Sequence, residues 1–270
     1  ADIEIIDTKA ERRKRGMIGN ISRKLLDHMK AALDSKEQIL ILRSRRAWAT
    51  ALQCTECGDI QKCPHCNVSM SLHKTNGNMV CHSCGYNAPY TGRCGKCSGQ
   101  LTPLGAGSQK IEEEISTLFP NAVTARLDSD SSDHEQTIKR FAKGEIDILV
   151  GTQMVGKGFD FSNLNLVAVI AADTMLGIQD FRADEKAFHL LEQFRGRCGR
   201  RDRKGLFVIQ TSQPEHPIYA NLAGTTQEDF SSGLLAERQD FGFPPYSRII
   251  EITIRDGYED RAERMSRWLG

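Results

Sequence analysis

The sequence lacks a strong net charge, a long apolar run and a secretory leader. Its 36 basic and 35 acidic residues give a formal net charge of +1, so composition does not indicate a nucleic-acid-binding protein and any basic surface must be local. No run of about 18 consecutive apolar residues is present, which argues against a membrane-spanning helix. From these absences we expect a soluble, cytoplasmic protein.

Two local basic runs stand out against this neutral background. We expect the first, from Arg12 to Arg15, to be a solvated turn. The second run is too rich in arginine and too regular for that explanation, and it consists of Arg195, Arg197, Arg200, Arg201, Arg203 and Lys204.

Short apolar runs alternate with segments of helical periodicity over most of the chain. We expect Asn20 to cap a helix whose apolar positions run from Ile21 to Ala32, and Ser108 to cap a second helix. Alternating strands and helices predict an open parallel sheet covered on both faces, an α/β architecture that looks RecA-like. The expected strands are Gln38–Leu42, Ala122–Leu127, Ile146–Val150, Leu166–Ala171 and Leu206–Thr211, with further helices near Asp133–Lys143 and Asp184–Arg197.

Eight of the nine cysteines interrupt this alternation in four consecutive C-x-x-C pairs. Two such pairs complete a tetrahedral site of four thiolates, so the segment predicts an inserted domain with two structural zinc ions. Four disulfides are the less favoured alternative. A sequential scheme joins neighbouring pairs, whereas the nested scheme, which we favour, ties the start of the insertion to its end. The nested sets are Cys54, Cys57, Cys94 and Cys97 (site 1), and Cys63, Cys66, Cys81 and Cys84 (site 2).

The remaining polar residues of the insertion are less informative. The cysteines already satisfy two sites, so His65, His73 and His82 are expected in exposed polar roles. Basic residues outnumber acidic ones, so the surface of the insertion either contacts nucleic acid or an acidic partner or is merely solvated.

Two short sequences contain groups that are suited to binding phosphate. In ILVGTQMVGKGFD an apolar strand runs into Gly151, Thr152 and Gln153, and backbone donors with a hydroxyl at the carboxyl end of a strand suit a phosphate. In QFRGRCGR, Arg197 and Arg200 share one face if the segment is helical, where two guanidinium groups could meet a triphosphate.

These sequences resemble a known family. GTQMVGKGFDF is similar to motif V, and QFRGRCGR to motif VI, of superfamily 2 helicases. With four C-x-x-C pairs inserted, the chain resembles the PriA family of bacterial primosomal replication-restart helicases, also called primosomal protein N′. Nearly the whole chain is covered, including the words CHSCG, DFRADE and FGFPPY.

The resemblance implies roles for individual residues. Arg197 and Arg200 would act as arginine fingers on ATP, and Gln193 would sense nucleotide at the same face. The residues implied to contact DNA or to couple that contact to the nucleotide are Gly151, Thr152, Gln153, Lys157, Gly158, Asp160, Gly196 and Gly199. Cys198 is expected to be a packing thiol rather than a nucleophile.

The resemblance also indicates what is missing. No G-x-x-x-x-G-K-[ST] sequence and no acidic Walker B box occur, so we expect a fragment that does not hydrolyse ATP alone. The expected domains are residues 1–50 and 105–235 for the second helicase lobe, 51–104 for the zinc-binding insertion, and 236–270 for the truncated start of a C-terminal α+β domain. An antiparallel β segment is expected over Asp240–Ile254, and a helix over Tyr258–Leu269.

For the full-length protein, the resemblance implies a nucleoid-associated, ATP- and magnesium-dependent 3′ to 5′ DNA helicase. It would bind forked DNA or D-loops and start primosome assembly with primosome proteins and single-stranded-DNA-binding protein. The alternative is a non-enzymatic zinc-ribbon scaffold for nucleic acid or protein, which would have no use for the paired arginines.

Overall fold

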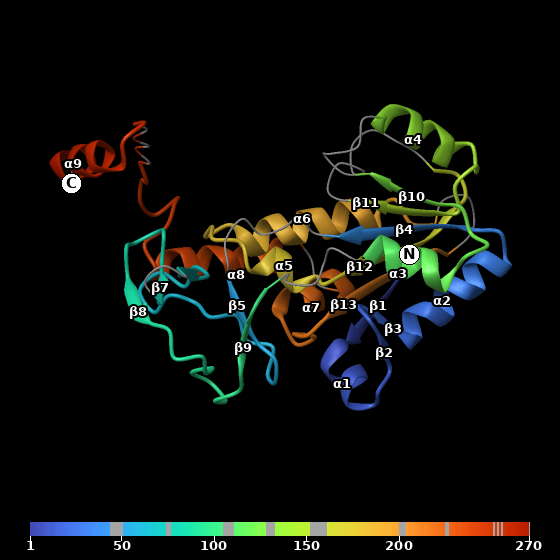
Figure 1. Ribbon diagram of the computed structural model, residues 1–270, viewed down its shortest axis with the longest axis horizontal. Coiled ribbons are helices and arrows are strands. Elements are labelled where there is room, and N and C mark those ends of the chain that lie inside the picture. Colours follow the sequence, from blue (N-terminus) through green and yellow to red (C-terminus); the bar gives the residue numbers. More distant parts are fainter. Residues whose placement is uncertain are drawn as a thin grey trace.

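A parallel sheet forms the centre of the molecule (Figure 1). The computed structural model describes residues 1–43, 51–73, 77–104, 111–127, 133–151, 161–199, 204–224, 227–250, 252, 254 and 256–269. Among these residues, six strands pair in the order β1-β13-β12-β4-β11-β10, and every pairing is parallel. The strands are β1 (Asp2–Asp7), β4 (Gln38–Arg43), β10 (Thr124–Leu127), β11 (Ile148–Gly151), β12 (Leu164–Ile170) and β13 (Leu206–Thr211).

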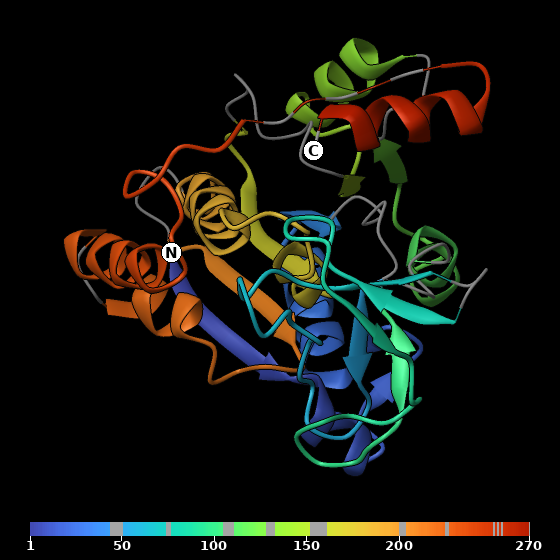
Figure 2. The ribbon, with the colours of Figure 1, turned by 90° about the vertical axis from the view of Figure 1, so that its left-hand side faces the viewer.

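Helices cover both faces of this sheet. Alternate residues of β4 enter opposite cores, Ile39 and Ile41 on one face and Leu40 and Leu42 on the other. The first face is covered by α2 (Arg23–Asp34) and α3 (Ile111–Leu118), and the second by α4 (His134–Ala142), α5 (Asp173–Leu176), α6 (Ala183–Arg195) and α7 (Pro217–Gly224). The turned view in Figure 2 shows β1 and β13 side by side beneath their helices. The predicted α/β class is confirmed, and the strand ends lie within three residues of those predicted.

The Cys-rich segment is inserted between β4 and α3, as predicted. Its first strand, β5 (Leu52–Cys54), pairs antiparallel with its last strand, β9 (Leu101–Pro103), so the insertion starts and ends at one place. Between them, β6 (Ser71–His73), β7 (Asn78–Val80) and β8 (Asn87–Pro89) form a small antiparallel sheet. We call residues 51–104 the zinc module.

The N-terminal region differs from the prediction in one respect. After β1 come helix α1 (Thr8–Arg13) and a hairpin of β2 (Met17–Ile18) and β3 (Ile21–Ser22). The cap of α2 is Ser22, whose Oγ accepts a hydrogen bond of 3.1 Å from the Leu25 backbone, and not Asn20. Asn20 lies in the hairpin turn, where its amide donates to the Glu114 carboxylate at 3.0 Å.

The C-terminal region also departs from expectation. Helix α8 (Gln227–Asp240) runs through the expected domain boundary at 235–236. In the described part of Asp240–Ile254 no strand is formed. Glu251 and Thr253 of the expected β segment lie outside the described residues. Helix α9 (Glu259–Leu269) follows, standing apart from the sheet in Figure 1.

None of the helices in the described part of the chain combines the length and the hydropathy that a bilayer crossing requires.

Candidate metal centres and helicase motifs

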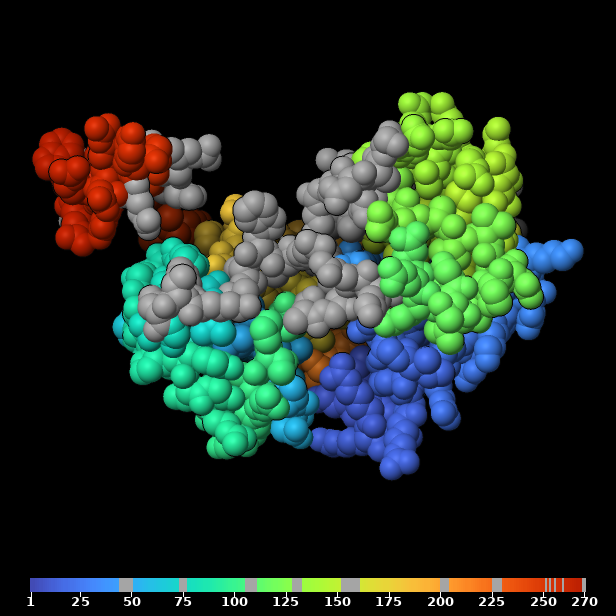
Figure 3. Space-filling model, in the orientation of Figure 1, coloured from blue at the N-terminus to red at the C-terminus, as the bar shows by residue number. Residues whose placement is uncertain are grey.

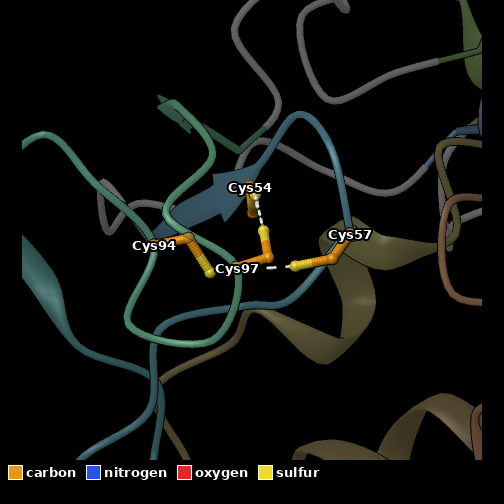
Figure 4. Close-up of side chains that lie close together, drawn as sticks. All are labelled: Cys54, Cys57, Cys94 and Cys97. Atoms are coloured by element: carbon orange, nitrogen blue, oxygen red, sulfur yellow. Dashed lines mark hydrogen bonds between the residues drawn. The ribbon is translucent and has the colours of Figure 1, made fainter.

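Four thiols converge where the zinc module starts and ends. Cys54 ends β5, Cys57 lies in the turn after it, and Cys94 and Cys97 lie in the loop before β9. Their sulfur atoms point toward one another (Figure 4). The Cys54 and Cys97 sulfurs are 3.5 Å apart, and those of Cys57 and Cys94 are 3.7 Å apart. A disulfide would need about 2.05 Å, whereas four sulfurs around a zinc ion with bonds of about 2.3 Å lie about 3.8 Å apart. The geometry fits a zinc site with four cysteine ligands.

The second set of thiols comes from the two middle C-x-x-C pairs, which lie in sequence between the two pairs of the first set. The Cys63 and Cys84 sulfurs are 3.5 Å apart, and those of Cys66 and Cys81 are 3.4 Å apart. The structure therefore groups the cysteines in the nested arrangement, and two four-cysteine zinc-binding sites are present. All four positions of each site are thiols, so neither leaves the open coordination position that a catalytic zinc needs.

Burial makes one thiol of each set, Cys57 and Cys66, unfavourable as a free anion. Burial raises the pKa of the Cys57 thiol to about 12 and also raises the pKa of Cys66. These two thiols therefore hold their protons until a cation displaces them, which is the behaviour of a structural zinc site. The four-thiol donor sets and the distances between their sulfur atoms both fit structural zinc ions.

One backbone turn is repeated four times around these cysteines. In each pair the first cysteine N–H donates to the carbonyl five residues later at 2.8–2.9 Å, as from Cys54 to Asp59 and from Cys63 to Val68. The residue after each second cysteine has a positive φ, and these residues are Gly58 (77°), Asn67 (54°), Gly85 (76°) and Ser98 (60°). The glycines were evident in the sequence, whereas Asn67 and Ser98 become evident only once the four pairs are aligned on one another.

We call the set of Cys54, Cys57, Cys94 and Cys97 the outer zinc site and the other set the inner zinc site. The zinc module contacts the parallel-sheet lobe at the outer site. Lys9 Nζ donates to the Cys57 carbonyl at 2.9 Å, and Gln53 Nε2 donates to the Ser212 hydroxyl at 2.8 Å. Gly58 lies so close to the Ser212 carbonyl that no side chain fits between them. These contacts join the outer zinc site to the carboxyl ends of β1 and β13, a connection that the sequence did not indicate.

A second contact lies at the inner site. The Asn67 amide donates to the Glu237 carboxylate at 2.5 Å, which joins the Cys63–Cys66 turn to α8. Phe181, just before α6, stacks on Phe243 with ring centroids 4.7 Å apart, and Phe243 packs within the module's own apolar cluster. The module is therefore held by both the lobe and the segment after α8.

The motif V residues are only partly placed. Gly151 ends β11 and is buried at the carboxyl edge of the sheet. Thr152, Gln153, Lys157, Gly158 and Asp160 lie outside the described residues.

The motif VI residues lie at the opposite edge. Helix α6 ends at Arg195, two residues before its predicted end, so Arg197 lies in a turn rather than on a helical face. Gln193 is exposed, Gly196 caps the helix, and Gly199 (φ 75°) donates to the Leu164 carbonyl at the start of β12. Arg200 lies outside the described residues. Because β12 has seven residues, Gly151 and Arg197 are separated by about 20 Å along the strand direction.

Cys198 anchors the motif VI turn. Its buried thiol donates to the carbonyls of Asn165 at 3.1 Å and Leu206 at 3.2 Å, at the amino ends of β12 and β13. Burial raises its pKa to about 11, so it stays a neutral packing group, as expected. The neighbouring Arg195 donates to the Leu222 carbonyl at 2.8 Å and to Glu192 at 2.9 Å, so it serves structure.

Comparison with known proteins agrees with this geometry. A family model described as the helicase conserved C-terminal domain matches residues 107–202, and one described as the PriA DNA helicase Cys-rich region domain matches residues 63–89, which hold the inner zinc site. The fold and its two zinc sites thus define a helicase C-terminal lobe that carries a Cys-rich insertion.

Relatives of the whole chain narrow this class. The chain is 34% identical to the replication restart protein PriA of Bacillus subtilis over 94% of its length, 36% to that of Haemophilus influenzae over 96%, and 37% to that of Treponema pallidum over 90%. It covers 32%, 36% and 38% of these relatives, respectively. The chain belongs to the family of the replication restart protein PriA, of whose members it spans about a third.

Zinc content tests the nested sites. The purified chain should hold two zinc ions, and Cys94→Ala or Cys81→Ala should each leave about one, because each removes a ligand from a different site. Cys198→Ser is the matched control, since this ninth cysteine lies outside both sets and should keep two. Elemental analysis by mass spectrometry measures the result. Fewer than two ions in the unmodified chain would contradict the two four-cysteine sites.

Alanine substitutions at Gly58 and Gly85 test the close contact between Gly58 and Ser212. Gly58 and Gly85 occupy the same place in their turns with nearly equal φ, but a side chain at Gly85 would meet nothing within 4 Å. Gly85→Ala should therefore cost about 1–2 kcal/mol of unfolding free energy for the left-handed backbone alone. Gly58→Ala adds the clash with Ser212 and should cost at least about 3 kcal/mol. Equal losses in denaturant unfolding would show that the Gly58 contact is not tight in solution.

Proposed function

We propose that this chain is the second helicase lobe and zinc-binding region of an ATP-dependent 3′ to 5′ DNA helicase. The full protein would recognise stalled forks or D-loops and initiate primosome assembly. The observation that supports this most is the two-zinc module inserted between β4 and α3 of a lobe that matches the helicase C-terminal domain.

Arg197 and Arg200 are the proposed arginine fingers. The turn that holds Arg197 is fixed by Cys198 to the amino ends of β12 and β13, so the guanidinium is presented from a rigid base. Gln193 is exposed one turn earlier on α6, at the same edge. Fixed cationic donors of this kind stabilise charge that develops on a transferred phosphoryl group, while ATP and magnesium would be bound mainly by a first lobe.

DNA is proposed to bind at the other edge. Gly151 leads from the carboxyl end of β11 into Thr152 and Gln153, which we propose contact the backbone of DNA, with Lys157, Gly158 and Asp160 coupling that contact to the nucleotide. Placing the DNA and nucleotide groups at opposite ends of the strands separates the two functions by about 20 Å. Rigid strands and α6 are then the physical link between them.

The proposal extends to partners and location. In the full protein, the zinc module would help unwinding and assembly with primosome proteins and single-stranded-DNA-binding protein at the nucleoid.

ATP hydrolysis by this chain alone is the first test. The sequence has no Walker A sequence and no Walker B box, so the phosphate cradle and the magnesium ligand are missing. We expect no DNA-stimulated phosphate release above background from the purified chain. Robust release would show that the chain holds a complete nucleotide site.

Arginine substitutions in the full-length protein form the second test. Arg197→Ala and Arg200→Ala should each lower ATP turnover at saturating DNA by up to about 10³- to 10⁵-fold. Arg195→Ala is the matched control from the same motif, because its guanidinium is already bound to Leu222 and Glu192, and turnover should stay near normal. Unchanged turnover in Arg197→Ala and Arg200→Ala would show that the arginine-finger assignment is wrong.

A further inference from the structure

A rigid basic turn lies beside the outer zinc site. It comprises the last turn of α1, with Arg12 and Arg13, and the Lys14–Arg15 segment after it; α1 begins at the carboxyl end of β1 with Asp7 as its cap. Backbone hydrogen bonds hold it, among them Gly16 N–H to the Glu11 carbonyl at 2.7 Å and Arg23 N–H to the Gly16 carbonyl at 2.7 Å. Arg15 has a φ of 54°, so its backbone is fixed in the left-handed region. The turn is a preorganised structure rather than a loose loop.

The cations of this turn have no anionic partner. Residues 7–15 contain five basic and two acidic residues, a net charge of +3 within a chain whose total is +1. Lys9 is occupied by the Cys57 carbonyl. The side chains of Arg12, Arg13, Lys14 and Arg15 are exposed, and none forms an ion pair with a carboxylate in the part of the chain that the structure describes.

A cavity of about 180 Å³ with a mixed polar and apolar lining opens beside Arg12. It lies between the zinc module and the lobe, whose N-terminal segment and module face each other across a hollow in Figure 3. Its walls carry hydroxyl and amide groups from both sides, together with apolar side chains such as Met17, Leu104 and Ile111. The residues that contribute hydroxyl or amide groups include Thr8, Asn20, Gln53, Thr55, Thr102 and Ser212.

The one buried carboxylate in the wall of this cavity is already satisfied. Asp173 accepts hydrogen bonds from the Thr211 hydroxyl at 2.7 Å and from the Ser212 N–H at 2.9 Å, one on each oxygen. These bonds offset part of its negative charge, and the Arg12 cation lines the same cavity. Sites for drug-sized ligands have volumes of about 300–1,000 Å³, so this smaller cavity suits a single phosphate group rather than a cofactor.

We propose that the basic turn and this cavity form a second binding site for the phosphate backbone of DNA. The inference rests on the proposed function, since it concerns the same nucleic acid. In a parallel sheet the carboxyl ends of β1 and β11 share one edge, so the turn lies on the side that also carries Gly151. Four strand spacings of about 4.8 Å separate these strands, about 19 Å in all. At about 3.4 Å per phosphate of one strand, some six phosphates span that distance.

Chemistry favours a nucleic acid backbone over an acidic protein segment. A phosphate accepts hydrogen bonds from neutral hydroxyl donors as well as from arginine, and Arg12 lines the cavity together with the Thr8 and Ser212 hydroxyls. The donors of Gln53, Thr55 and Thr102 are already bonded within the protein.

The test is the salt dependence of binding by this chain to fluorescently labelled single-stranded DNA. Arg12→Ala/Arg13→Ala removes two phosphate contacts and should reduce the slope of log affinity against log salt by about 1.4, at about 0.7 per contact. Affinity at 0.1 M salt should fall roughly ten- to thirtyfold. Both side chains are exposed at the end of a helix, so the fold should be retained, as circular dichroism will show.

Two further variants sharpen this test. Lys30→Ala/Lys143→Ala removes the same charge from exposed positions on α2 and at the end of α4, away from the basic turn, and should leave the slope unchanged. Thr8→Val removes only a neutral hydroxyl, so it should weaken binding about two- to tenfold with no change in slope.

The possible results separate the two proposals. Equal slopes for the unmodified chain and Arg12→Ala/Arg13→Ala would overturn the second site alone. Equal losses from the Lys30→Ala/Lys143→Ala control would show only general charge attraction and would also overturn it. No DNA binding by the unmodified chain would overturn this site and count against the proposed function as well. If the arginine variant instead loses binding to polyglutamate but not to DNA, the turn is a protein-binding surface and the inference is wrong.

Discussion

The insertion of the zinc module into the middle of the sheet sets the main constraint on this chain. β4 lies between β12 and β11, so the chain must leave a central strand and return to the same place before α3. Closing a flexible loop becomes costlier as the loop grows, by about 0.6 kcal/mol for each doubling of its length. A structural zinc site contributes far more, about 10–16 kcal/mol in zinc-finger peptides. The free energy of the outer zinc site, together with the β5–β9 ladder, therefore exceeds the cost of holding the two ends of the insertion together.

Features fixed by short-range chemistry were predictable from the sequence. Four C-x-x-C pairs and the need to return to one place indicated the nested zinc sites, and apolar runs indicated the buried strands of a parallel sheet. Features that depend on a distant partner were not. Ser22 rather than Asn20 caps α2 because Glu114, far along the chain, holds Asn20 in the hairpin. IIEITI alternates like a strand, yet no strand pairs with it among the described residues.

The same distinction applies to the functional residues. Motifs V and VI are recognisable as sequence patterns, but only the structure shows that Gly151 and Arg197 lie at opposite edges of the sheet. Contacts of Lys9, Gln53 and Gly58 with the rest of the molecule have no sequence pattern, because each joins segments that are far apart along the chain. Arg12–Arg15 were expected to be a solvated turn; they are exposed, but the rigid backbone and the cavity beside them distinguish this turn from an ordinary solvated one.

Helix α6 connects the zinc module to the motif VI turn. Its thirteen residues span about 20 Å, and Ala187, Phe188, Leu191 and Phe194 bury one side of it against the sheet. At its start, Phe181 stacks on Phe243 and also lies under the Arg238 guanidinium at 5.2 Å, so DFRADE and FGFPPY meet there. At its end, Cys198 ties the Arg197 turn to the sheet. Because a packed helix moves as a rigid body, a force on the inner zinc site is borne by the same element that positions Arg197.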